Sequence, residues 1–293
     1  MKKLYICMLA LMVISSAYSQ KFRSVDLETA WSGDSKTIQF SVNNKDYCDY
    51  YVAINVTDMT GFEPFFSPYI TTINKGISSL FSLKREGSAS TNYSCTYRYY
   101  RGNVNRKVNP GYIYLLPVKS GDSISVRPKE NSAYTLLFDL SNASDTVYAC
   151  RGGIVCDDNL YDVIDMYNSR KYQQLTVYHD DGSFGQYAHW DTPLVFPGQV
   201  IEAGAPIAVV SKKGKNIFSE RFSFGVYFLD KNQLKDLQKG NKYTNLVPVF
   251  HTADAGDVKL ETNKTYISGI TDDLIMQDMS KKEKAKYLKN INK

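Results

Sequence analysis

Three histidines are the residues of this chain best suited to bind a metal or to move a proton: His179, His189 and His251. Neutral imidazole is a common metal ligand, and its ordinary pKa makes it a common proton shuttle. A catalytic zinc needs about three protein ligands and an open position for water. The spacing of these histidines therefore decides whether the chain can build such a site from them.

The run Asp180-Asp181-Gly182-Ser183 separates two apolar segments and predicts a β-hairpin. With the turn at Asp181-Gly182, His189 pairs with Gln174. His179 then lies five residues further along that strand, roughly 17 Å away at ~3.3 Å per residue, and the odd offset places the two side chains on opposite faces. They cannot share one metal, and His251 has no predicted place. We expect His179 at an exposed loop edge.

Signatures of other enzyme classes are absent from the sequence. The chain has no Gly-x-Ser-x-Gly nucleophile elbow and no glycine-rich nucleotide-binding run. Adjacent carboxylates at 157–158, 180–181 and 272–273 are expected to serve turns or helix caps. The run from Asp157 to Asp162 could bind calcium but lacks the spacing of a known calcium loop.

The first 19 residues have the pattern of an export signal. Lys2 and Lys3 precede an apolar stretch, Leu4–Ile14, that is too short to span a bilayer. Small residues at Ala17 and Ser19 indicate cleavage before residue 20. We therefore expect an exported protein, periplasmic, secreted or at the cell surface, with no later transmembrane span.

Four cysteines remain after residue 19: Cys48, Cys95, Cys150 and Cys156. An even number in an oxidising compartment indicates disulfides, with three possible connectivities. We favour Cys48–Cys95 and Cys150–Cys156, because each pair stays within one expected domain. Four buried free thiols are the alternative. The spacings do not match a zinc ribbon or finger.

The elements that must position these residues are mostly strands. Thr37–Val42 alternates with period two, and Tyr50–Val56 and Tyr112–Val118 are similar, which predicts a sandwich-like module. This module is rich in aromatic residues that form either a sugar-binding platform or ordinary strand surface. The aromatic residues and their interleaved arginines are Tyr47, Tyr50, Tyr51, Tyr93, Tyr97, Arg98, Tyr99, Tyr100 and Arg101.

Further strands are predicted in the second half, followed by helices. The predicted strands are Tyr134–Asp139, Thr146–Ala149, Gly152–Cys156, Phe222–Phe228, Leu246–Phe250 and Thr265–Ile267. A short helix is expected in Asp230–Lys239. A basic helical tail is expected from Ser280 to Lys293, where Ser280 and Glu283 form a capping box.

Four motifs of the second half occur together in one known family. They are Val147-Tyr148-Ala149 followed by Gly153-Ile154-Val155, Asp181-Gly182-Ser183, Gln186-Tyr187-Ala188-His189, and the run from Gly198 to Ile207. Their order resembles the LytM/lysostaphin-type zinc endopeptidases, which cut peptide cross-links in bacterial cell walls. The resemblance covers about Asp122 to Asp230.

The resemblance also implies where the zinc ligands should lie. The family's His-x-x-x-Asp corresponds to Thr135 and Asp139, and its His-x-His to Arg221 and Ser223. Tyr187 and His189 fall on its Tyr-x-His strand. No histidine precedes His179 and none lies between His189 and His251, so no shift in register restores the missing ligands. Asp139 and His189 alone remain at matching positions, and Arg221 would repel a divalent cation.

The sequence thus predicts an all-β chain: an N-terminal β-sandwich-like module, then a lysostaphin-like (duplicated-hybrid-motif type) antiparallel domain. The expected divisions are a signal peptide at 1–19, the β module at 20–120, the degenerate LytM-like domain at 121–252, and a closing strand with the basic tail at 253–293. The vestigial cleft would contain Asp139, His189, Tyr187, Arg221, Ser223 and Thr135, with no catalytic residue, metal or cofactor.

The expected function is non-catalytic. The cleft would bind peptidoglycan, as peptide or glycan, or a partner protein of the cell envelope, with His189 either a ligand contact or a retained structural residue. An active zinc metalloendopeptidase with a rearranged site using Asp139 and His189 is one alternative, and a purely structural surface protein is the other. The net charge of +5 is mild and no nucleic-acid motif accompanies it.

Overall fold

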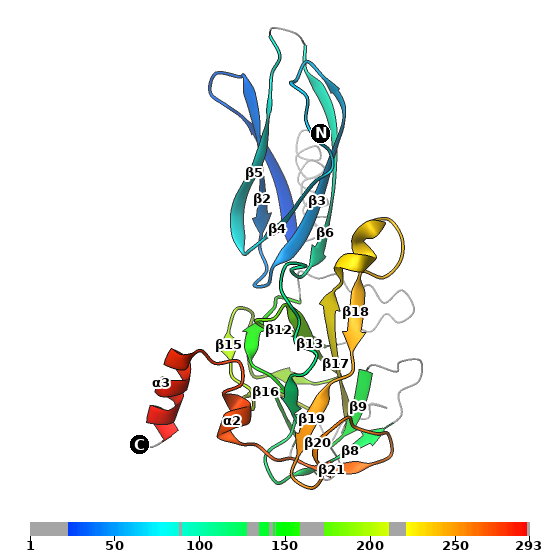
Figure 1. Cartoon of the computed structure of the whole chain (residues 1–293), viewed down its shortest axis with the longest axis vertical. Helices are drawn as coiled ribbons and strands as arrows, with labels where there is room; N and C mark the ends of the chain where they lie inside the picture. The colour runs from blue at the N-terminus through cyan, green and yellow to red at the C-terminus, as the bar shows by residue number, and fades with distance from the viewer. Residues whose placement is uncertain are drawn as a thin grey trace, which may run out of the picture.

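The structure is a computed structural model that describes residues 23–87, 90–127, 135–140, 143, 145–158, 173–210 and 221–291. The expected signal peptide, Tyr134 and Asp162 lie outside these residues. The chain forms an elongated molecule of two β units stacked end to end (Figure 1). Nearly all strand pairs are antiparallel, which confirms the predicted all-β class.

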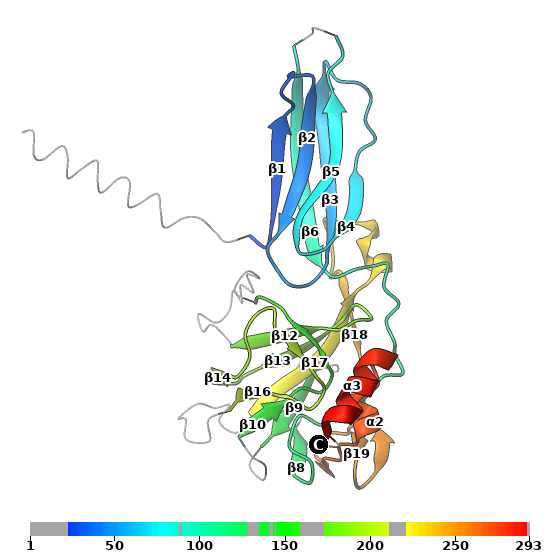
Figure 2. The ribbon, with the colours of Figure 1, turned by 90° about the vertical axis from the view of Figure 1, so that its left-hand side faces the viewer.

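The N-terminal unit is a sandwich of two three-stranded sheets. One sheet has the order β1-β2-β5 and the other β4-β3-β6, and Figure 2 shows the two facing each other. Their strands are β1 (Val25–Trp31), β2 (Thr37–Asn44), β3 (Tyr50–Thr60), β4 (Tyr69–Ile73), β5 (Gly76–Lys84) and β6 (Asn92–Arg101). The predicted alternation is visible in β2, where Ile38, Phe40 and Val42 enter the core between the sheets.

The aromatic residues of this unit do not form the exposed platform considered from the sequence. Tyr50 and Tyr51 are buried, and so is Arg101, at 1% exposure. Tyr97 and Tyr99 are half-buried and pack against the sandwich core. Strand alternation turns every second side chain inward, so most of this aromatic surface contributes to packing.

The second unit is built around a nine-stranded sheet with the order β15-β11-β12-β13-β17-β9-β8-β21 and β18 beside β17. Its strands are β8 (Ser123–Arg127), β9 (Thr135–Asp139), β11 (Gly153–Val155), β12 (Gln174–Tyr178), β13 (Ser183–Ala188), β15 (Val200–Ile201), β17 (Arg221–Leu229), β18 (Tyr243–Leu246) and β21 (Thr265–Ile267). Two small sheets, β10-β16-β14 and β20-β19-β7, complete the unit. Their strands are β7 (Ile113–Leu115), β10 (Thr146–Tyr148), β14 (Thr192–Pro193), β16 (Pro206–Val209), β19 (Val249–Thr252) and β20 (Gly256–Val258).

Two segments lie elsewhere than the sequence suggested. Residues 112–118 were expected in the N-terminal module, but β7 pairs with β19 and Tyr114 and Leu116 enter the core of the second unit. The strand expected over Leu246–Phe250 is divided into β18 and β19 around Val247-Pro248, because proline has no N–H to donate to a ladder. β21, expected in a closing segment, pairs with β8 of the large sheet.

The helices are short. A 3-10 turn, η1 (Lys231–Lys235), begins at Asp230, whose side chain accepts a hydrogen bond from the Asn232 N–H. α2 (Asp272–Ile275) and α3 (Lys281–Ile291) follow the last strand. The predicted capping box is confirmed: Glu283 Oε2 accepts from the Ser280 N–H at 2.8 Å, and Ser280 Oγ accepts from the Glu283 N–H at 3.4 Å. Among the described helices, none is long and apolar enough to cross a membrane.

Candidate functional site

The β12–β13 hairpin positions two of the three histidines, one residue away from the predicted register. Tyr178 pairs with Phe184, and the His189 N–H donates to the carbonyl of Gln173 at 3.2 Å. The turn is longer than expected because His179 pairs with Ser183, with three residues between them. His179 therefore lies six residues beyond Gln173, roughly 20 Å along the strand. His179 and His189 are as far apart as predicted. Their offset along the strand is even, however, so the argument that an odd offset puts them on opposite faces was wrong.

His179 was expected at an exposed loop edge and is instead buried, at 1% exposure. Its Nδ1 lies 2.7 Å from the carbonyl oxygen of Gly152. Gly185 lies beneath the ring, and a Cβ there would stand 3.0 Å from Nε2. Burial and the nearby Arg151 guanidinium lower the pKa of His179 to about 3. The imidazole is therefore neutral at physiological pH and serves the packing of the hairpin.

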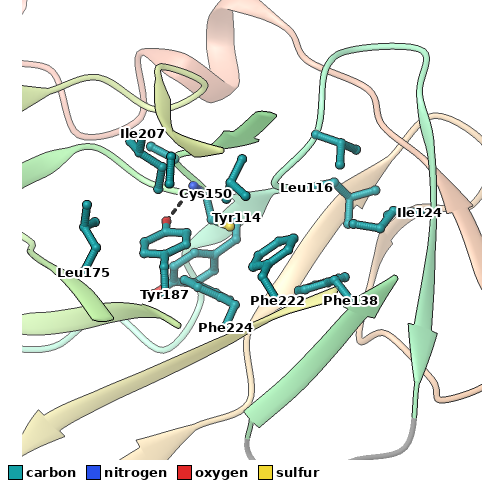
Figure 3. Packing of buried hydrophobic residues seen from close by; sticks show 14 of the residues in the cluster. Tyr114, Leu116, Ile124, Phe138, Cys150, Leu175, Tyr187, Ile207, Phe222 and Phe224 are labelled. Carbon is teal, nitrogen blue, oxygen red and sulfur yellow. Dashed lines mark hydrogen bonds between the residues drawn. The ribbon is translucent and has the colours of Figure 1, made fainter. Parts of the chain in front are cut away.

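Tyr187 was expected on the floor of a cleft and lies instead in the hydrophobic core. Strand alternation places it opposite Phe224, and the two rings are 4.8 Å apart. Its hydroxyl accepts a hydrogen bond from the Cys150 N–H at 2.8 Å (Figure 3). Tyr187 fixes the segment before β11 and is not available to a ligand.

Four of the other predicted residues, all except His189, share the opposite face of the sheet, which we call the β9–β17 face. Arg221 stands directly opposite Asp139, and Ser223 is two pairs further along, opposite Leu137. Thr135 lies opposite Gly225 at the far end of β9. Because Phe138 and Phe222 stack in the core, the residues alternating with them must point to this face. Asp139, Arg221 and Ser223 thus lie near one another on this face.

Charge on the β9–β17 face does not suit a divalent cation. Asp139 is 6% exposed, and its Oδ2 accepts from Arg127 Nε on β8 at 2.9 Å. Arg221 is the cross-strand neighbour of Asp139, a position in which Cβ atoms are about 5 Å apart. One guanidinium is therefore bonded to this carboxylate, and a second arginine is its cross-strand neighbour. Arg127 had no signal in the sequence, because its contact depends on the pairing of β8 with β9.

His189 is remote from Asp139. β17 lies between β13 and β9, which separates the two strands by about 10 Å, twice the ~4.8 Å strand spacing. His189 has a φ of 72°, so the backbone leaves the strand at this residue. His251, on β19, is paired with Asp257 at 2.6 Å. The histidines do not converge.

Within the described residues, one group of three His, Cys, Asp or Glu side chains has its donor atoms close enough to hold a metal: Asp46, Cys48 and Cys156. Neither Asp139 nor His189 belongs to it. A catalytic zinc would need a third ligand beside Asp139 that this part of the chain does not supply. The residues of the β9–β17 face therefore do not fit the zinc that the family resemblance implies.

A buried arginine that sequence reasoning missed explains the Asp-Gly-Ser motif. Arg151 is 1% exposed and donates to both oxygens of Asp278, at 2.8 and 3.0 Å, and to Asp181 at 2.9 Å. It also stacks over the ring of Tyr112 at 3.9 Å. Burial alone would raise the pKa of Asp181, but the Arg151 guanidinium and the hydrogen bonds from Ser183 lower it to about 2. Asp181 thus anchors the hairpin to the C-terminal segment.

The two β units meet at a buried polar junction. Arg101 Nη2 donates to Asp46 Oδ2 at 2.6 Å, and its Nη1 donates to Asp158 Oδ1 at 2.7 Å. Tyr178 of β12 donates its hydroxyl to Asp49 Oδ2 at 2.9 Å. Gly198 packs against the Tyr47 ring so closely that a Cβ would stand 2.2 Å from a ring atom. The sandwich is therefore docked on the large sheet through specific bonds.

The predicted disulfide pairs are not formed: Cys48, Cys95, Cys150 and Cys156 are free thiols in the structure. Cys48 lies just before Tyr50, whereas Cys95 pairs with Val56, six residues further along β3. At ~3.3 Å per residue this separation far exceeds the reach of a disulfide. Cys150 and Cys156 belong to different hydrophobic clusters.

A cavity of about 510 Å³ lies away from the β9–β17 face. It is formed where the N-terminal sandwich meets η1, and its lining includes Tyr51, Ile70, Val104, Lys231 and Lys235. None of the predicted site residues contributes to it.

Comparisons with known proteins give weak likenesses. No protein-family model and no curated protein matches the chain. Among solved structures it is similar to pseudoalterin, described as a novel M23 metalloprotease from the deep sea, with 14% identity, a TM-score of 0.29, and coverage of 40% of this chain and 70% of that one. Two crystal forms of Helicobacter pylori Csd3 are each 11% identical. The orthorhombic form has a TM-score of 0.31 and the hexagonal form 0.27, covering 90% and 77% of this chain and 83% and 77% of theirs.

Identities this low concern the fold alone, and TM-scores this low support no conclusion about function. The resemblance to LytM-type proteins therefore continues to rest on the sequence motifs.

Proposed function

We propose that this chain is a non-hydrolytic binding protein of the bacterial cell envelope, and that its β9–β17 face holds a carboxylate-bearing peptide of peptidoglycan. The observation that carries the proposal is the environment of Asp139. Asp139 accepts a hydrogen bond from Arg127 and has Arg221 as its cross-strand neighbour. The resemblance assigns both Asp139 and Arg221 to positions of the family's metal site.

The charge balance of the face favours an anionic ligand. Arg127 and Arg221 carry two positive charges, and Asp139 compensates one of them. The Arg127 side chain is 46% exposed, and Arg221 is partly exposed. A guanidinium presents a planar fork of donors that matches a carboxylate and can bind it through two parallel hydrogen bonds.

Peptidoglycan stem peptides carry free carboxylates, and the sequence motifs resemble a family that acts on those peptides. The predicted export signal would bring the chain to the compartment where they occur. A face with arginine in place of metal ligands can retain the affinity for the peptide without the hydrolytic step, because hydrolysis needs an activated water that the residues present do not generate.

The proposal is tested by co-sedimentation of the purified chain with insoluble peptidoglycan. Arg221→Ala and Arg127→Ala should each weaken binding by about tenfold, as expected for loss of one charge-assisted bond. Arg98→Ala is the matched control, because Arg98 is an exposed arginine on β6 of the other unit. It should bind like the unmodified chain.

Two outcomes would contradict the proposal, and each favours a different alternative. Equal binding by all three variants would remove the β9–β17 face as the site and favour a structural surface protein. Zinc bound at one equivalent, together with release of peptides that a chelator stops, would favour an active metalloendopeptidase.

A further inference from the structure

Two cysteines from different units meet at the junction between the sandwich and the large sheet. Cys48 lies in the loop between β2 and β3, and Cys156 directly follows β11. Both are 2% exposed. Their sulfur atoms and a carboxylate oxygen of Asp46 all lie within 4.8 Å of one another. This is the one place in the described chain where two thiols gather with a third potential ligand.

A metal ion does not fit this group, because the carboxylate of Asp46 is already saturated. Its Oδ2 accepts from Arg101 Nη2 at 2.6 Å and from the Tyr50 hydroxyl at 2.9 Å. Its Oδ1 accepts from the backbone N–H groups of Tyr47 and Asp157, both at 2.7 Å. A cation would have to displace these donors and stand beside a buried guanidinium, which repels it.

A covalent bond between the two sulfurs meets none of these obstacles. Burial raises the pKa of the Cys48 thiol, so this group is neutral in the folded protein, and a disulfide is neutral as well. Replacing the thiols by a disulfide therefore leaves the charge balance around Arg101 and Asp46 unchanged. Asp46 loses only the weak contact from the Cys48 thiol, 3.5 Å away.

We propose that Cys48 and Cys156 form a disulfide that fastens the N-terminal sandwich to the nine-stranded sheet when the chain folds in an oxidising compartment. A disulfide is about 2.05 Å long, so sulfurs within 4.8 Å must approach by less than about 3 Å. Rotation about the Cα–Cβ bonds supplies a movement of this size. The proposal does not depend on the function of the β9–β17 face.

The reaction is thiol–disulfide exchange with an external disulfide such as oxidised glutathione. One cysteine thiolate attacks the external disulfide and releases a thiolate, and the second cysteine then attacks the mixed disulfide and releases another. The two cysteine protons pass through water to the released thiolates, and two electrons pass to the oxidant, which is thereby reduced to two thiols. Because both side chains are buried in the folded state, the exchange takes place before the junction closes.

The bond would join residues that are 108 positions apart, from 48 to 156. A cross-link over so long a loop restricts the unfolded chain strongly and stabilises the folded one. It would also keep the sandwich on the sheet if the polar contacts of the junction opened.

The test is to refold the full chain from denaturant in a glutathione redox buffer, block remaining thiols with an alkylating reagent in denaturant, and map the peptides by mass spectrometry without reduction. We expect Cys48 and Cys156 unmodified and linked to each other, and Cys95 and Cys150 alkylated. A reductant should lower the melting temperature of the refolded chain by about 3–8 °C. It should leave the melting temperature of the Cys48→Ala/Cys156→Ala variant unchanged, with Cys95→Ala as the control that keeps the reductant response.

Alkylation of both Cys48 and Cys156 in the refolded, unmodified chain would overturn the proposal without any variant having to fold. So would a link from either residue to Cys95 or Cys150. One equivalent of zinc that protects both thiols from alkylation and is released by a chelator would overturn it in favour of a metal site.

Discussion

Replacing Arg101 by methionine should destabilise the protein more than any exposed substitution in the same strand. Arg101 is 1% exposed and pairs with Asp46, which is fully buried, and with Asp158, whose side chain is 15% exposed. Methionine preserves much of the apolar stem but removes the charge and every donor. The two carboxylates would then remain at the junction without a counter-ion.

The magnitude follows from this burial. Removing one partner of a buried ion pair costs about 3–5 kcal/mol, because the remaining charge is neither solvated nor compensated. For a chain of this size that corresponds to a fall in melting temperature of roughly 5–8 °C. Arg101 also donates to the carbonyl of Asp157 at 3.1 Å, so the upper part of this range is expected.

The stability lost in Arg101→Met should increase as the pH rises. Burial raises the pKa of Asp158 even with Arg101 present, and removal of the guanidinium should raise it further. The folded variant then binds a proton that the unfolded chain has released, so its stability falls as the pH rises above the unfolded pKa. The penalty of Arg101→Met should accordingly be smaller at pH 5 than at pH 8.

The assay is equilibrium denaturation followed by tryptophan fluorescence and by calorimetry at both pH values. Arg98→Met on the same strand is the matched control, because Arg98 is exposed, and it should cost less than about 0.5 kcal/mol. A triple variant in which Asp46 and Asp158 also become asparagine should recover part of the stability lost in Arg101→Met. If Arg101→Met costs no more than Arg98→Met, the junction is not held by the buried ion pairs and the reasoning fails.

Three further results are expected. The folded-state pKa of His179 is about 3 against 6.5 for the free side chain, so between these pH values the unfolded state binds more protons and acid destabilises the protein by up to about 1.4 kcal/mol per pH unit. His179→Asn keeps a donor for the Gly152 carbonyl and should lose stability less steeply in acid denaturation. An unchanged slope would contradict the neutral buried imidazole. Gly102→Ala should destabilise the junction in thermal melts, because Gly102 has a φ of +123° and its Cβ would stand 2.8 Å from Leu229 Cβ; a melting temperature equal to that of the unmodified chain would show that the backbone can yield there. Ser280→Ala removes the N-cap of α3 and should make amide exchange in this helix roughly fivefold faster, while the melting temperature stays unchanged. Equal exchange rates would mean that the cap does not stabilise this helix.

The sequence predicted local structure correctly where the residues that determine it are neighbours in the chain. The alternation in β2, the existence of the hairpin around Asp181-Gly182 and the Ser280–Glu283 capping box all appear as predicted. The hairpin register was missed by one residue. It depends on which turn hydrogen bonds form, and the side chain of Asp181 settles this by accepting from the Ser183 N–H and hydroxyl.

Contacts between distant segments had no signal in the sequence. Arg127 meets Asp139 because β8 pairs with β9, and Cys48 meets Cys156 because the sandwich docks on the large sheet. The sequence suggested a cleft position for Tyr187 and an exposed aromatic surface for Tyr50, yet strand alternation and the second layer bury both side chains.

By itself the sequence determined that the chain is built from strands and that its histidines are too few and too far apart to form the zinc centre of the family it resembles. Only the tertiary structure decided which charges surround Asp139 and which cysteines lie together. Periodicity and turn chemistry act over a few residues, whereas ion pairing, burial and thiol contact depend on how sheets are layered, and that is set by packing across the whole chain.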